Sequence, residues 1–214
     1  MGIMSLFTNP ANAILEAKKT RSMGSTMLVL LISALLLAIL VGIVTALTTR
    51  SSYTYSYYSY GSSGPNIAAV VIGAFTTFMA VFLGGLFAGY LISVAMRTLG
   101  GTGGFFEGLT TVAYALYVPS IALFIMGLLA TGAVLAGGMG VVMIMVGMVV
   151  LMWGVILGIA TFYRSLKELF STDMVTALVG GTIMSAPAGI MVWAVMTMMP
   201  YMMRPIYTMG MGYY

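Results

Sequence analysis

Few side chains in this sequence could do chemistry, and the acids are the first to consider. The 214 residues contain four acids and no histidine or cysteine. Thiol chemistry, imidazole acid–base catalysis and Cys or His metal ligation are therefore excluded. The acids fall near the ends of apolar segments, where capping or solvation is the usual role: Glu16, Glu107, Glu168 and Asp173. The sequence thus predicts a protein that is not an enzyme and that holds no cofactor or metal.

Two other patterns are considered for ligand binding. The run Gly100-Gly101-Thr102-Gly103-Gly104 resembles phosphate-cradling loops in composition, but no Lys-Ser/Thr pair follows it and no strand precedes it. Nucleotide binding is therefore not expected. The 22 methionines are spread over nearly every apolar segment, which argues against a copper site and favours a gap-filling role between helices.

The composition places the chain in a lipid bilayer. Hydrophobic residues make up 61% of the sequence and charged residues 6%, and the mean hydropathy is +1.11. Twelve charges cannot coat the surface of a soluble 22.6 kDa protein, so lipid must cover it. Because the net charge of +4 is dispersed near the segment ends, nucleic-acid binding is not expected.

Five apolar segments exceed or approach the roughly 20 to 25 residues that cross a hydrocarbon core. They are residues 24–47, 66–96, 109–136, 140–163 and 174–199. Pro119 and Pro187 lie inside the third and fifth segments and should kink those helices, because proline removes one backbone hydrogen bond. The sequence predicts an all-α fold, a polytopic membrane helical bundle of five transmembrane helices forming a single domain over residues 1–214.

Two segments flank the first span. Residues 9–22 begin with Asn9 and Pro10 and divide into apolar and basic faces, which predicts a short interfacial amphipathic helix. A solvated basic start that only orients the next span is the alternative. Residues 50–65 form a loop rich in Tyr and Ser, for which we expect packing in the headgroup region or a short strand pair. Binding of a sugar or a partner is the less favoured interpretation of this loop.

The basic residues indicate the orientation, because cytoplasmic loops carry the excess of Lys and Arg. With the N-terminus inside, only Arg50 and Arg204 lie outside. The other six lie inside: Lys18, Lys19, Arg21, Arg97, Arg164 and Lys167. We therefore expect a multi-pass protein of the cell membrane with a cytoplasmic N-terminus, an external C-terminus and an external Tyr/Ser loop.

Small residues recur at helical spacing within the spans and predict close helix packing, since lipid removes the hydrophobic drive for association. The candidates for helix packing are Gly85, Gly89, Gly147, Gly154, Gly158 and Gly181. Packing within one bundle is the favoured interpretation, and homodimerisation is the alternative.

Two polar segments interrupt the spans on the predicted cytoplasmic side. We call residues 97–108 the glycine hinge and residues 164–173 the basic hinge. Antiparallel spans bring them to one membrane face, where their acids should pair in part with their bases, and Ser171 or Thr172 should cap the fifth span. The candidate partner surface comprises Arg97, Gly100, Gly101, Gly103, Glu107, Arg164, Lys167, Glu168 and Asp173.

The glycine hinge and the span after it resemble the Ypt-interacting-protein (Yip, or YIPF) domain family. The resemblance rests on Leu99-Gly100-Gly101, Gly103 and Phe105-Phe106, followed by Tyr114 and Pro119, together with five spans. Trp153 through Leu169 and the segment around Pro10 extend it over most of the chain. It implies membrane trafficking, contact with Rab-type GTPases and membrane shaping for eukaryotic members, and a similar fold without an assigned activity for prokaryotic ones.

The sequence has no long cytosolic N-terminal region of the eukaryotic pattern, which argues against the expectation of GTPase binding. The resemblance therefore favours a prokaryotic membrane protein, for which an archaeal source is one option. We expect a scaffold or accessory protein that organises membrane lipids or another membrane or cytoplasmic protein through its hinges. The alternative is a small-solute transporter or channel whose helices are broken at Pro119 and Pro187. A water-filled cavity between facing polar side chains would favour that alternative: Thr76, Thr77, Tyr114, Ser120 and Ser185.

Overall fold

The computed structural model describes residues 10–51, 67–135 and 139–183, and over these ranges its regular structure is entirely helical. A short helix at the start precedes four long ones, and a further helix, Met174–Ile183, follows them. The labelled elements are α2 (Pro10–Thr20), α3 (Met23–Ser51), α4 (Ile67–Thr98), α5 (Phe105–Leu135) and α6 (Gly140–Phe170).

The four long helices, α3 to α6, are each long and apolar enough to cross a membrane. They contain 29, 32, 31 and 31 residues. At 1.5 Å per residue such helices exceed the roughly 30 Å hydrocarbon core, so they must tilt or extend into the headgroup region. The chain therefore has the architecture of a membrane-spanning helical bundle.

The helix boundaries differ from the predicted ones at the polar ends. α5 begins at Phe105, four residues before the predicted start at residue 109, and α6 continues seven residues past residue 163. Of the predicted fifth span, the structure describes the helix Met174–Ile183, and Pro187 lies outside the described residues. α3 runs through Ser51, and the rest of the predicted Tyr/Ser loop also lies outside them.

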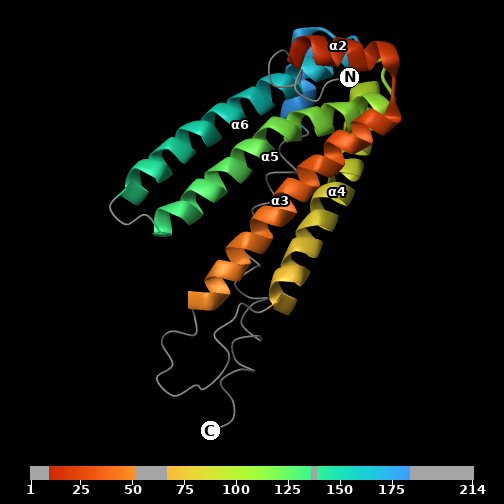
Figure 1. Ribbon diagram of the computed structural model, residues 1–214. Helices are drawn as coiled ribbons and strands as arrows, with labels where there is room; N and C mark the ends of the chain where they lie inside the picture. The colour runs from red at the N-terminus through yellow and green to blue at the C-terminus, as the bar shows by residue number, and fades with distance from the viewer. Residues whose placement is uncertain (1–9, 52–66, 136–138, 184–214) are drawn as a thin grey trace.

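The helices form two antiparallel pairs that meet at one end (Figure 1). The pair α3–α4 and the pair α5–α6 lie close together where α2 crosses the bundle, and they diverge toward the opposite end. α5 is central, because it contacts α3, α4 and α6, while α2 contacts α6. We call the end that carries α2 the polar end.

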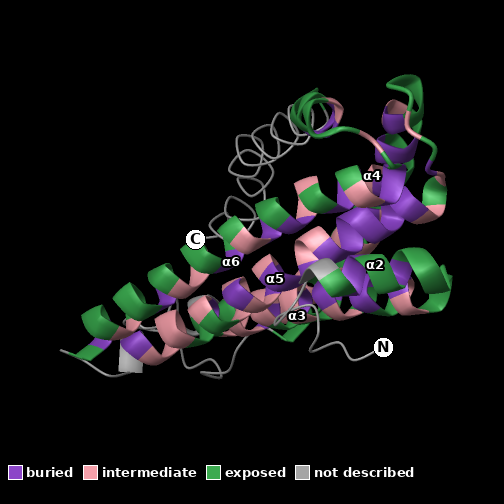
Figure 2. Cartoon of the chain, turned by 90° about the horizontal axis from the view of Figure 1, so that it is seen from above, coloured by how far each residue is buried: buried purple, intermediate pink, exposed green. Residues whose placement is uncertain are grey.

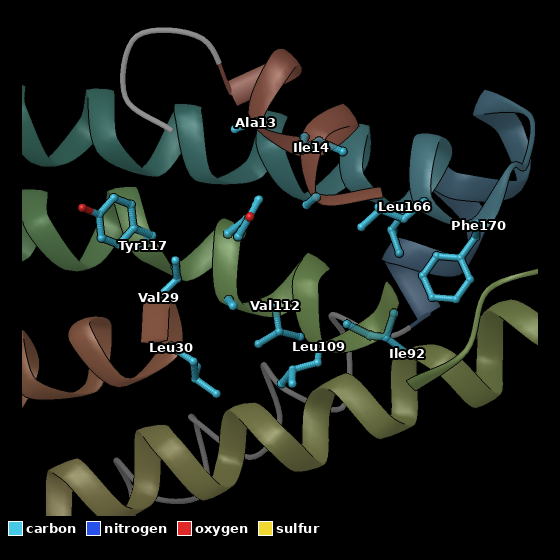
Figure 3. Packing of buried hydrophobic residues seen from close by; sticks show 14 of the residues in the cluster. Ala13, Ile14, Val29, Leu30, Ile92, Leu109, Val112, Tyr117, Leu166 and Phe170 are labelled. Carbon is cyan, nitrogen blue, oxygen red and sulfur yellow. The ribbon is translucent and has the colours of Figure 1, made fainter. Parts of the chain in front are cut away.

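The buried side chains gather toward the polar end. Figure 2 shows buried residues concentrated near α2, whereas the outer turns of α6 are exposed. Ile14 of α2, Leu30 of α3, Leu109 of α5 and Phe170 of α6 are fully buried in one cluster (Figure 3). The outward faces carry large exposed apolar side chains, such as Trp153 at 66% exposure. Lipid is the solvent that such faces suit.

α6 packs on α5 through its glycines. A methyl group on Gly154 would overlap Cβ of Ala122, and one on Gly158 would overlap the ring of Pro119. A methyl group on Gly147 would lie 3.2 Å from Cγ of Met126. α5 remains helical through Pro119. The stripe on α6 thus lets two backbones approach more closely than larger residues would allow.

The glycines of α4 contact two different helices. A methyl group on Gly85 would lie 2.7 Å from Cδ1 of Leu30 in α3. One on Gly89 would lie 2.8 Å from Cα of Leu109 in α5, and one on Gly108 would overlap the carbonyl oxygen of Gly89. The Gly89–Gly108 crossing is therefore a direct backbone contact, for which neither helix has room for a side chain.

The Gly154 contact gives a direct stability test. Gly154→Leu should force α5 and α6 apart and lower the free energy of unfolding by about 1 to 3 kcal/mol through overpacking. Met148→Leu is the matched control, because Met148 is 51% exposed on the same helix and should tolerate the change. Thermal unfolding in detergent measures both variants, and equal midpoints would contradict the packing account.

Candidate partner surface at the polar end

The two hinges contact each other at Phe170, the last residue of α6. Its side chain is fully buried, and the backbone of the glycine hinge lies against it. The amide nitrogen of Thr102 donates to the carbonyl oxygen of Phe170 at 3.1 Å. A methyl group on Gly103 would overlap the phenyl ring. The glycine hinge thus supplies one of the donors that the C-terminal carbonyls of α6 require.

Two other glycines are fixed by backbone geometry. Gly100 has a φ of +89°, which L side chains rarely adopt. The amide nitrogen of Gly101 donates to the carbonyl oxygen of Met96 at 2.8 Å. A methyl group on Gly101 would lie 2.8 Å from that oxygen. The chain therefore turns tightly out of α4 before it reaches Phe170.

Arg97 holds the glycine hinge from the last turn of α4. Its Nε donates to the carbonyl oxygen of Gly103 at 2.8 Å, while the residue as a whole stays exposed. Arg97 therefore fixes the conformation of the hinge and still presents charge at the surface.

Glu107 closes the N-terminus of α5. Its Oε2 accepts from the amide nitrogen of Gly104 at 2.7 Å, which is the backward half of a capping box. Its Oε1 accepts from the guanidinium of Arg21 in an ion pair. Glu107 is 5% exposed, so this carboxylate is compensated by a backbone donor, by Arg21 and by the positive end of the α5 dipole.

The prediction of which cation pairs with Glu107 was wrong. We predicted pairing with bases of the two hinges, but the cation comes from Arg21, at the junction of α2 and α3. Arg21 has a φ of 45° and donates its amide nitrogen to the carbonyl oxygen of Ala17 at 2.9 Å, which ends α2. The left-handed conformation turns the chain from α2 into α3, and the side chain ties this elbow to α5.

Lys18 fastens α2 to α6. Its Nζ donates to the carbonyl oxygen of Glu168 and, at 3.0 Å, to Oγ of Ser171. The apolar side of α2 is buried below it at Ala13, Ile14 and Ala17. A lysine donor at the C-terminal carbonyls of a helix also complements the helix dipole. α2 is therefore held across the polar end by both apolar and polar contacts.

The cap of the helix Met174–Ile183 also differs from the prediction. Ser171 has a φ of 54° and ends α6 by donating its amide nitrogen to the carbonyl oxygen of Lys167. The capping acceptor is Asp173, whose Oδ2 accepts from the amide nitrogens of Val175 at 3.2 Å and Thr176 at 3.3 Å. Hydrogen bonds from the side chain and the backbone of Thr176 hold the pKa of Asp173 below its usual value. Asp173 directly precedes Met174 and so occupies the N-cap position, where its charge also favours the positive end of the helix dipole, whereas Ser171 serves as the C-cap of α6.

The remaining predicted surface residues lie on α6. Arg164 and Lys167 are exposed and Glu168 is half-buried. Among the described residues, none of these three side chains forms an ion pair or a hydrogen bond. The structure therefore gathers the glycine hinge, Glu107 and the end of α6 around Phe170 and leaves two cations uncompensated on the outer side of α6.

The polar side chains expected of a carrier do not gather. Tyr114 and Ser120 are buried in α5, whereas Thr76 is exposed on α4. Thr77 donates its hydroxyl to the carbonyl oxygen of Gly73 at 2.8 Å. Ser185 lies outside the described residues. Within the described ranges, no group of three or more His, Cys, Asp or Glu residues could hold a metal ion.

Sequence reasoning missed two sets of buried hydroxyls. Those of Thr26 in α3 and Thr110 in α5 lie 3.2 Å apart in a buried hydrogen bond. On α6, Thr161 and Ser165 are buried and their hydroxyls have no partner among the described residues. Thr161 and Ser165 follow Gly158, the glycine that contacts Pro119, by three and seven residues, and this helical spacing was the signal that both would face α5.

The comparisons with known proteins add no relative. No protein-family model, no curated protein and no solved structure matches this chain. Any function assigned to the chain therefore depends on the residues and geometry of the polar end.

Glu107 provides the test of how this end is held together. Glu107→Ala removes both the acceptor of the Gly104 amide and the partner of Arg21, and should lower the free energy of unfolding by about 1 to 3 kcal/mol. Glu107→Gln keeps an acceptor for Gly104 and should cost less. Thermal unfolding in detergent measures these variants against Glu168→Ala, which removes an acid without a side-chain partner in the described structure. Equal midpoints for Glu107→Ala and Glu168→Ala would contradict the assignment.

Proposed function

We propose that the chain is a non-enzymatic integral membrane scaffold or accessory protein of the Yip-domain type, which organises a partner or the bilayer through its polar end. The observation that carries the proposal is the joining of four segments there: α2 through Lys18, the α2–α3 elbow through Arg21, the glycine hinge through Thr102, and the end of α6 through Phe170. A surface fixed by contacts between segments so distant in sequence suits recognition, because its groups are positioned before a partner arrives.

The proposal includes five spans with α2 as an interfacial amphipathic helix. α2 packs Ala13, Ile14 and Ala17 into the core of the bundle and exposes Lys19. What supports the interfacial position is that α2 crosses the end at which the long helices meet (Figure 1). A methyl group on Gly180 would lie 2.7 Å from Sδ of Met96 in α4, and one on Gly181 would lie 2.6 Å from Cε1 of Tyr163 in α6. This helix thus starts between α4 and α6, a position that supports a fifth span over residues 174–199.

The proposed orientation places the polar end in the cytoplasm. Lys18, Lys19, Arg21, Arg97, Arg164 and Lys167 all belong to this end of the bundle, and basic residues concentrate on the cytoplasmic side of membranes. The protein would then be a multi-pass protein of the cell membrane with its N-terminus inside and its C-terminus outside.

A small-solute transporter or channel is the second candidate. The observation in its favour is the pair of unpartnered buried hydroxyls, Thr161 and Ser165, on the side of α6 that contacts the Pro119 region of α5. Polar groups of this kind line the sites of many carriers, but the broken helix that such sites use is not found at Pro119, because α5 is continuous through it. Against it stand the absence of a buried acid or base in mid-membrane among the described residues and an odd number of proposed spans, which does not divide into two equal repeats.

Charge reversal tests the scaffold function. Arg164→Glu with Lys167→Glu should leave the protein folded, because both side chains are exposed, and should abolish association with an acidic partner or with anionic lipid. Tagged parent and variant, extracted in mild detergent from the same membranes, are compared by quantifying the proteins and lipids that co-purify. The matched control is Glu16→Gln, a charge change on the exposed side of α2. A folded variant that retains every protein and lipid of the parent would contradict the proposed function.

A further inference from the structure

The basic residues of the polar end fall into two groups. Three of the described cationic side chains are held by acceptors within the protein: Lys18, Arg21 and Arg97. The other three are exposed and have no acceptor among the described residues: Lys19, Arg164 and Lys167. The first group serves the fold, and the second group is free to bind an anion outside it.

The depth of Arg164 and Lys167 in the membrane follows from the length of the exposed apolar face of α6. Large apolar side chains are exposed along this helix from Val141, at 63%, to Ile159, at 53%. These eighteen steps correspond to about 27 Å of helix, close to the roughly 30 Å hydrocarbon core of a bilayer. The lipid-facing part of α6 therefore ends near Ile159.

Arg164 and Lys167 come five and eight residues after Ile159, which is about 8 to 12 Å further along the axis. Helical side chains lean toward the N-terminus of their helix, so both cationic groups reach back toward the end of the apolar face. The headgroup region adds several ångströms on each side of the hydrocarbon core. The two cations thus lie at the depth of lipid phosphates.

The two cations also continue the lipid-facing side of α6. Ile156, Ala160, Arg164 and Lys167 are all exposed and are spaced by three or four residues, which places them on one face. A lipid whose phosphate contacts Arg164 and Lys167 would therefore lay its acyl chains along Ile156 and the apolar turns before it.

The neighbouring acids do not neutralise this pair. Asp173 uses its carboxylate to cap the helix Met174–Ile183. Glu168 is half-buried, and in the described structure its carboxylate forms no ion pair with Arg164 or Lys167. The carbonyl oxygen of Glu168, which could otherwise attract a cation, is occupied by Lys18.

We propose that Arg164 and Lys167 bind the headgroup phosphate of an anionic phospholipid, with its acyl chains along the exposed apolar face of α6. This inference rests on the proposed function and names the lipid as the partner of the polar end. A cytoplasmic protein that uses the same cations is a different outcome, which the measurement below separates from the lipid.

The test uses the purified full-length protein in detergent, titrated with phosphatidylglycerol or phosphatidylcholine, and native mass spectrometry to measure the first lipid-binding step. The parent should prefer phosphatidylglycerol. Arg164→Gln with Lys167→Gln should weaken phosphatidylglycerol binding by about fivefold per cation removed and leave phosphatidylcholine binding unchanged. Thermal unfolding without added lipid verifies that the variant is folded.

Two controls fix the site and the chemistry. Lys19→Gln removes an exposed cation from α2 and should leave the preference for phosphatidylglycerol intact, as should the charge-retaining variant Arg164→Lys with Lys167→Arg.

Equal phosphatidylglycerol binding by the parent and the neutralised variant would overturn the inference, as would an equal loss of binding in Lys19→Gln. Competition by inorganic phosphate at concentrations similar to those of the lipid would overturn it too, because it would show a site for a soluble anion. A neutralised variant that binds phosphatidylglycerol like the parent, alongside a charge-reversed one that loses a protein partner, would overturn the lipid site and leave the proposed function standing.

Discussion

The backbone contact between Gly89 of α4 and Gly108 of α5 is the constraint on which the polar end depends. A side chain at either position would collide with the opposite backbone. Helices in lipid gain little from hydrophobic association, so such close approach supplies much of their packing. Gly108 directly follows Glu107, and the same contact therefore places the carboxylate where Arg21 can reach it. The contact of this glycine pair thus fixes the position of Glu107 at the polar end.

The spans were predictable because their cause is local. Length and hydropathy alone identify an apolar helix, and α3, α4, α5 and α6 lie where the sequence placed them. The ends were less predictable, because they depend on caps. α5 starts at Phe105 since Glu107 returns to Gly104, and α6 continues to Phe170 since the glycine hinge and Lys18 satisfy its last carbonyls.

The contacts of the polar end illustrate what a sequence does not specify. That Glu107 needs a cation follows from its burial, but burial is known only once α4 and α5 have been packed. Arg21 was then one of several bases at the same end of the bundle, and its selection depended on its own left-handed conformation at the α2–α3 elbow. By contrast, the packing role of the α6 glycines was recognisable in advance, because glycines that recur on one face of an apolar helix let a second backbone approach closely.

The central claim is that α3 and α5 meet at their polar starts, beside Arg21 and Glu107, and a disulfide tests it most directly. The chain contains no cysteine, and the hydroxyl oxygens of Thr26 and Thr110 lie 3.2 Å apart. In the double variant Thr26→Cys with Thr110→Cys, mild oxidation should join the two thiols within one chain, so that neither reacts with an alkylating reagent until a reductant is added. Two thiols that both remain reactive after oxidation of the folded protein would contradict this arrangement of the polar end.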